Sequence, residues 1–106
     1  MPKYLFTGSF AVDGARGVLA EGGSSRRAAV EKMFGSLGGT LESYYFAFGS
    51  DDYYIVGDLP GNAAAAAAAL TTSASSTVHT RTVVLLTPEE VDAVSKLSVS
   101  YRAPGR

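Results

Sequence analysis

The stretch ESYYFAFGSDDYYIVGDLP, residues 42–60, decides the fold, because it contains two strand-like runs separated by a short loop. Residues 40–48 and 53–59 are rich in aromatic and β-branched side chains, which fit a pleated surface. Residues 49–52, Gly-Ser-Asp-Asp, have the composition of a hairpin loop, because glycine allows positive φ and Ser and Asp bond nearby backbone amides. The stretch therefore predicts a β-hairpin in the middle of the chain.

On the N-terminal side of this hairpin, the sequence predicts one strand and a helix in two pieces. Residues 3–12 alternate as a strand does. Asp13 is the expected N-cap of a short helix over residues 14–21, which a glycine pair ends. Ser24 or Ser25 is expected to cap a second helix, and its apolar positions recur at i, i+3, i+4 and i+7. That apolar stripe consists of Val30, Met33, Phe34 and Leu37.

On the C-terminal side, the sequence predicts a helix, a strand and a last helix. Asn62 is the expected N-cap of an alanine-rich helix to about Ser75, because alanine has the best helix propensity and its small side chain allows close packing. Residues 78–86 read as the fourth strand. The last helix, to about Leu97, begins with a capping box and a proline at the first helical position. These capping residues are Thr87, Pro88 and Glu90.

The order strand, helix, strand, strand, helix, strand predicts an α+β fold of the ferredoxin-like kind. Its sheet has four antiparallel strands, its two main helices cover one face, and an extra helix follows at the C-terminus. At 106 residues the chain is long enough for one core, so we expect a single domain over residues 1–97. Residues 98–106 lack periodicity and are expected to form a flexible tail.

Composition indicates that the bare face of this sheet is covered. Hydrophobic residues make up 46% of the chain and charged residues only 18%, which is more apolar than a typical soluble domain. Both alternating sets in every predicted strand are apolar, so both faces of the sheet need a cover. We expect the last helix to shield part of the second face and a partner copy to shield the rest. Tyr45, Tyr53 and Ile55 are expected near that contact, in a homo-oligomer resembling a dimeric α+β barrel.

Other features exclude several functional classes. A net charge of −1 provides no basic field for nucleic acid or an acidic membrane. The chain has no cysteine, which excludes disulfides, thiolate zinc sites and cysteine nucleophiles. No apolar run reaches membrane-spanning length and the start does not resemble a signal peptide, so we expect a cytoplasmic protein without a membrane partner. No cofactor-binding motif occurs, and no cofactor is expected.

Two groups of residues are candidate binding sites, one in the hairpin loop and one at the start of the second helix. Gly49, Asp51 and Asp52 are interpreted as a structural turn. The alternative is a hard cation held by the two carboxylates, but the further oxygen ligands that such ions need are missing.

Arg26 and Arg27 lie in the first turn of a helix, where positive charge opposes the helix dipole. Together with nearby free amides they would suit a small anionic ligand, and the alternative is that they face solvent or pair with Glu21 or Glu31.

A third candidate group lies on the strands. Four tyrosines could line a pocket: Tyr44, Tyr45, Tyr53 and Tyr54. Tyr45 and Tyr53 could meet His79 and Arg81 across the sheet and add to a ligand-binding site. His79 shares a face with Arg81 and is the only histidine, so one chain cannot form a two-histidine metal site, and we expect no metal. The alternative is that these residues are surface groups and that the aromatic residues are core or interface anchors.

Four separated segments resemble the GYD domain family: MPKYLFTGSF, EGGSSRRAAVEKMFGSLGG, YYFAFGSDDYYIVGDLP and TVVLLTPEEVD. The resemblance extends from Pro2 to about Ala93. It implies a ferredoxin-like fold in a small bacterial and archaeal family without a characterised reaction. The Gly-Tyr-Asp element of the family aligns with Gly49 and Asp52, and Asp51 stands where the family has tyrosine. This departure argues against an obligatory catalytic tyrosine there.

From these observations we expect a homo-oligomeric small-ligand-binding or scaffold protein. The alternative is a cofactor-independent oxygenase or isomerase of the dimeric α+β barrel kind, with Tyr45, His79 and Arg81 in a pocket between sheet and helices. A third class, a pure assembly module, would have no pocket. The sequence identifies no reaction, and it leaves open whether the protein is an enzyme.

Overall fold

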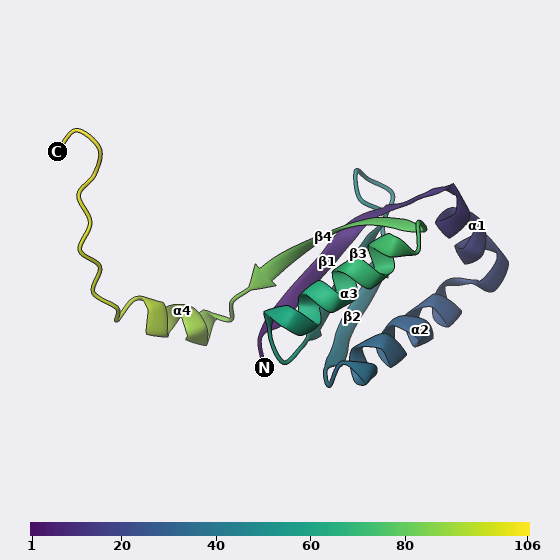
Figure 1. Ribbon diagram of the computed structural model, residues 1–106, viewed down its shortest axis with the longest axis horizontal. Coiled ribbons are helices and arrows are strands. Elements are labelled where there is room, and N and C mark those ends of the chain that lie inside the picture. The colour runs from purple at the N-terminus through teal and green to yellow at the C-terminus, as the bar shows by residue number, and fades with distance from the viewer.

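The computed structural model describes residues 1–106 and contains one four-stranded antiparallel sheet with two helices packed on one face (Figure 1). The strands are β1 (Lys3–Phe10), β2 (Thr40–Phe46), β3 (Tyr53–Asp58) and β4 (Val78–Leu85). The helices are α1 (Val12–Glu21), α2 (Gly23–Ser36), α3 (Asn62–Ala74) and α4 (Pro88–Val94). None of them is long and apolar enough to span a bilayer.

The strand order β2-β3-β1-β4 places β1 at the centre, antiparallel to both β3 and β4. This arrangement agrees with the ferredoxin-like topology, and the predicted α+β class and element order are confirmed. The central hairpin is also confirmed, because β2 pairs with β3 in antiparallel register. The dimeric assembly stays a prediction.

Three predicted helix caps differ from the structure. The N-cap of α1 is Ala11, not Asp13. Only Gly22, with a φ of 85°, separates α1 from α2, so α2 begins before the expected serine caps. Asn62 is the first residue of α3, and its side-chain oxygen accepts a hydrogen bond of 2.7 Å from the Tyr4 hydroxyl. Local capping is lost here because a long-range bond uses the same side chain.

The core lies between the sheet and the two helices α2 and α3. Val30 and Phe34 of the predicted stripe are buried, and Met33 and Leu37 pack against them, which confirms the stripe. Gly57 of β3 has no side chain because Phe34 occupies that place, and a Cβ there would collide with the Phe34 ring. The ten core residues are Tyr4, Phe6, Val30, Phe34, Tyr53, Ile55, Leu59, Ala65, Ala68 and Val78.

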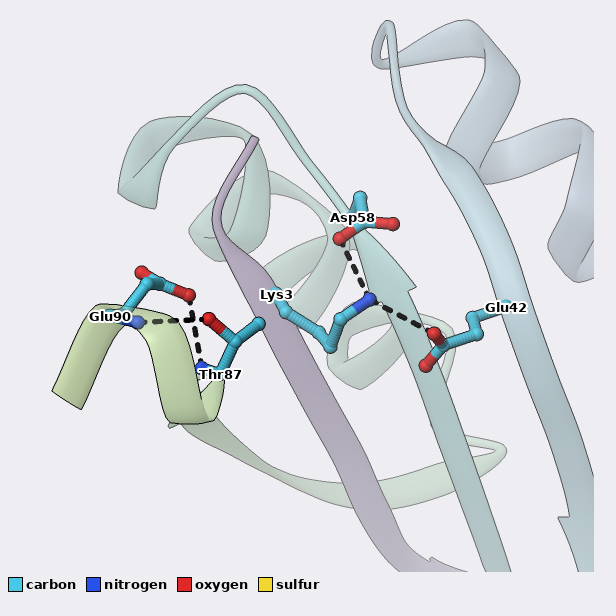
Figure 2. A network of polar contacts seen from close by, with 5 residues as sticks. All are labelled: Lys3, Glu42, Asp58, Thr87 and Glu90. Atoms are coloured by element: carbon cyan, nitrogen blue, oxygen red, sulfur yellow. Dashed lines mark hydrogen bonds and ion pairs between the residues drawn. The ribbon is translucent and has the colours of Figure 1, made fainter. Parts of the chain in front are cut away.

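One end of the sheet is tied together by charge (Figure 2). The Lys3 ammonium donates to Asp58 Oδ1 at 3.0 Å and to Glu42 Oε1 at 3.2 Å, and so joins β1 to β3 and β2. These bonds raise the pKa of Lys3 above its ordinary value of 10.5, and the bond to Asp58 has the larger effect.

Figure 2 also shows the predicted capping box of α4. The Glu90 amide donates to Thr87 Oγ1 at 3.1 Å, and the Thr87 amide donates to Glu90 Oε1 at 3.0 Å.

The face of the sheet opposite α2 and α3 carries no helix, and we call it the open face. Strand register places on it the residues that alternate with the core: Leu5, Thr7, Tyr45, Tyr54, Val56, His79, Arg81, Val83 and Leu85. Both faces of the sheet are therefore rich in apolar groups, as predicted. Tyr45 is 69% exposed and Val83 is 44% exposed.

Two predictions about the open face are wrong. The last helix does not cover it, because α4 buries none of its residues and lies away from the body of the molecule (Figure 1). Tyr53 and Ile55 are not on it, because they belong to the core under the helices. The sequence could not distinguish the two alternating sets of β3, since both are apolar.

Candidate functional site: a cleft between two helices

A cleft separates α2 from α3 above the middle of the sheet. Val30 and Met33 of α2 form one wall, and Ala68 and Thr72 of α3 form the other. At the bottom lies a cavity of about 30 Å³, which is large enough for about one water molecule. The cavity adjoins a groove of about 380 Å³ between the helices, lined by some of the same residues. Together they approach the size of a small-molecule site.

Aromatic and aliphatic side chains from all four strands form the floor of this cleft. It is apolar because each strand directs its core-facing residues toward the helices. Two phenol groups and a threonine hydroxyl interrupt it. The floor residues are Phe6, Phe10, Tyr44, Tyr53, Ile55, Val78 and Thr80.

Arg26 is the only charged residue that lines the cavity. It also borders the groove and a third hollow of about 100 Å³ beside α1, where Asp13 and Glu21 are lining residues. Arg26 forms no ion pair, whereas its neighbour Arg27 pairs with Glu31 at 3.2 Å in the exposed part of α2. The two adjacent arginines are therefore in different situations, and only Arg26 presents an unpaired charge to the cleft.

Two tyrosines complete the polar part of the cleft. Burial raises the pKa of Tyr44 above its ordinary value of 10.0, and the charge of Arg26 partly opposes this change. Burial likewise raises the pKa of Tyr53, against a hydrogen bond from Thr80 and the Arg26 charge. Both phenols keep their protons at neutral pH. They can therefore donate hydrogen bonds to a ligand, but they are not activated as bases.

Comparison with known families agrees with the fold. A family model for the GYD domain matches residues 4–94. The chain belongs to the GYD domain family. Searches of curated proteins and of solved structures gave no match to this GYD domain.

The structure does not bring all predicted site residues of the GYD domain together. Arg26 reaches the cleft, but Tyr45, His79 and Arg81 lie on the open face, on the other side of the sheet. The expectation that these three line a pocket between sheet and helices is wrong, because strand register turns their neighbours Tyr44, Val78 and Thr80 toward the helices instead. Residues 22–25 line none of these hollows, so their amides do not join Arg26 there.

The carboxylates of the hairpin aspartates bond to other strands rather than within their own loop. The Asp52 carboxylate accepts a hydrogen bond of 2.9 Å from the Phe10 amide. Asp51 accepts a bond of 3.1 Å from the Thr7 hydroxyl and forms an ion pair with Arg81 on β4. Gly49 is exposed at the loop tip. No group of three or more His, Cys, Asp or Glu residues could hold a metal ion anywhere in the chain.

Sequence reasoning missed Thr72 and Thr80 of the cleft, and it named four tyrosines as possible pocket residues without separating Tyr44 and Tyr53, which line the cleft, from their neighbours. Tyr44 and Tyr53 each precede or follow another tyrosine, so composition gave no reason to choose between adjacent positions. One signal was present for β4, because Val78 begins a run in which the even positions up to Thr82 carry no charge, whereas the odd positions carry His79 and Arg81. A charged alternating set favours the solvent side of a sheet.

Proposed function

We propose that this GYD domain is a homo-oligomeric small-ligand-binding protein whose ligand occupies the cleft between α2 and α3. The observation that carries the proposal is Arg26, a half-buried guanidinium without an ion pair at an otherwise uncharged, mostly apolar cavity. Removing a charge from water without a partner is unfavourable. A ligand anion would supply the missing partner and form charge-assisted hydrogen bonds.

The lining defines the class of ligand as a small apolar or aromatic molecule with one carboxylate. The aromatic floor favours a flat apolar ring, and the protonated phenols of Tyr44 and Tyr53 can donate to the carboxylate beside Arg26. The cavity of about 30 Å³ alone is too small for such a ring. Met33 borders both the cavity and the groove, and its flexible side chain can shift to admit the ring.

A thermal-shift titration with benzoate, phenylacetate and salicylate tests this proposal, with benzamide as the uncharged counterpart. We expect at least one carboxylate to raise the melting temperature. At a concentration about 100-fold above its Kd, the added stability is about 2.7 kcal/mol, which corresponds to roughly 10–20 °C for a domain of this size. Benzamide should produce little change, because it cannot pair with Arg26.

The adjacent arginines provide a matched pair of variants. Arg26→Gln should abolish the shift, whereas Arg27→Gln should retain it, since Arg27 pairs with Glu31 outside the cleft. If none of the carboxylates stabilises the unmodified protein, or if both variants lose the shift equally, the cleft is not the binding site proposed.

The two other functional classes receive less support. An oxygenase or isomerase that uses Tyr45, His79 and Arg81 has no pocket between sheet and helices in which those residues meet. A pure assembly module would need no cleft with an unpaired arginine. The scaffold role and the cytoplasmic location stay predictions.

A further inference from the structure

The C-terminal arm, residues 87–106, makes no hydrogen bond or ion pair with the rest of the chain. Its hydrogen bonds join residues within the arm itself. Figure 1 shows it leaving the end of β4 and extending away from the body. The radius of gyration is consequently 16.8 Å, against about 13 Å for a compact domain of this length.

The arm nevertheless carries several large apolar side chains. Leu97 is 70% exposed and Tyr101 is 76% exposed, although neither belongs to a binding site in the chain itself. Exposed apolar groups grouped on one short segment indicate a contact with another surface. The large apolar residues of the arm are Val91, Val94, Leu97, Val99 and Tyr101.

Backbone geometry directs the arm away from its own open face. Only Leu86 and Thr87 separate β4 from α4, and Thr87 is extended, with φ −74° and ψ 159°. The chain therefore continues outward from the end of the strand, and it has no turn that would return α4 to the sheet it has left. This short connection does not prevent the arm from reaching the open face of a second copy.

The area of the arm fits the open face of a second copy. A stable interface buries about 800 Å² on each partner, and each fully buried Val or Leu side chain contributes roughly 60–120 Å². Five arm side chains thus provide on the order of half of that area, and Tyr45, Tyr54 and Val83 of the open face can provide the rest.

We propose that two copies of this chain exchange their C-terminal arms, so that residues 87–106 of each copy lie across the open face of the other. The exchange is reciprocal, as two-fold symmetry requires. In this dimer each open face is covered by the partner's arm, and the apolar side chains of both are buried in the same interface. The open face is on the opposite side of the sheet from the cleft, so this inference does not depend on the ligand proposed above.

Light scattering combined with charged substitutions tests whether the arm holds the dimer. The unmodified chain should be a dimer at micromolar concentration. Val94→Asp with Leu97→Asp should raise the dissociation constant by about 100-fold or more, because both side chains would carry charge into the contact. The matched control, Val12→Asp with Leu19→Asp, alters two exposed apolar residues of α1 and should leave the dimer intact. A monomeric unmodified chain, or a dimer unaffected by the arm substitutions, would overturn the proposal.

A spin label locates the arm directly. Because the chain has no cysteine, Leu97→Cys provides a single attachment point. Labelled chains without ¹⁵N, refolded together with ¹⁵N chains that carry no label, report only contacts between copies. We expect broadening of amide signals at Tyr45, Tyr54 and Val83, and none at Ala29 or Ala66 on the helix side. Broadening seen only when label and ¹⁵N are in the same chain would show an arm folded back on its own sheet, and would refute the exchange.

Discussion

Asp52 is the residue through which the β2–β3 loop is attached to the central strand. Its amide donates to the Gly8 carbonyl at 2.7 Å, and its carbonyl accepts from the Ala47 amide at 2.8 Å. Its carboxylate accepts from the Phe10 amide at 2.9 Å, just beyond the last β1–β3 pair. Asp52 therefore ends the β1–β3 hydrogen-bond ladder and still gives the Phe10 amide an acceptor. This is the structural role expected for a turn aspartate.

We predict that Asp52→Ala lowers the free energy of unfolding by about 1–3 kcal/mol, because the Phe10 amide would lose its acceptor. Asp52→Asn should cost less, since the amide oxygen can still accept. Urea denaturation measures both changes, and Ser50→Ala at the exposed loop tip is the control, with an expected effect within about 0.5 kcal/mol. Equal stability of the Ala variant and the unmodified protein would show that the bond contributes nothing.

The raised pKa values of Tyr44 and Tyr53 predict a loss of stability at high pH. In the folded state these phenols hold their protons above the ordinary pKa of 10.0, so the unfolded chain loses protons first as pH rises. The free energy of unfolding should therefore be level below that pH and fall above it. The raised pKa of Lys3 acts in the same direction, starting from 10.5.

Tyrosinate absorbance and urea denaturation, followed from neutral to alkaline pH, check this prediction together. At least two of the six tyrosines should ionise at a pH above their ordinary pKa. Tyr44→Phe should remove one of these late ionisations, and the free energy of unfolding should fall less steeply with pH. Ionisation of all six at their ordinary pKa in the folded protein would contradict it.

At the scale of elements, α3 shows how an alanine-rich helix is used. Ala65 and Ala68 are buried against the sheet, and Ala68 borders the cleft, while Ala66 and Ala67 face outward. The small side chains let the helix backbone approach β4 closely. The close approach expected from the alanine run is thus found on one face of the helix only.

We predict that Ala68→Leu lowers the free energy of unfolding by about 1–3 kcal/mol, because Ala68 is buried and the cavity of about 30 Å³ beside it is too small for three more carbons. Ala67→Leu, one position along the same helix, should change it by less than about 0.5 kcal/mol. Thermal or urea denaturation of the two variants decides the matter. A destabilisation of similar size in both would mean that helix propensity rather than packing is responsible.

Element order could be predicted from the sequence, because turn residues and apolar periodicity are local. The apolar stripe of α2 and the capping box of α4 are examples. The facing of the strands could not be predicted, because Tyr44 and Tyr45, and likewise Tyr53 and Tyr54, are alike in composition and differ only through strand register. For this reason the sequence indicated Arg26 and four tyrosines as candidates, but not which two of the tyrosines line the cleft.

At the scale of the whole molecule, the open face and the arm are two apolar surfaces that no other part of the chain covers. The three principal extents, 57, 33 and 23 Å, reflect an arm that adds length without adding core. Local sequence signals predicted α4 itself, but not its separation from the sheet, because no local signal reports where a helix packs.

If folding and association are linked, the melting temperature should depend on protein concentration. We predict a rise of several degrees across a roughly hundredfold increase in concentration for the unmodified chain. The arm variant Val94→Asp with Leu97→Asp should melt at one temperature throughout. A melting temperature independent of concentration in both proteins would indicate that the folded chain is stable without a partner.

The capping box of α4 has a kinetic consequence. A helix of seven residues is marginal in water, and most such segments must be ordered at the moment of encounter. Thr87 and Glu90 bond each other's amides before any partner is present, so part of the conformational entropy is lost in advance. In the proposed dimer, docking would begin from this preorganised turn, and the ordering of the later arm residues would be left to the contact itself.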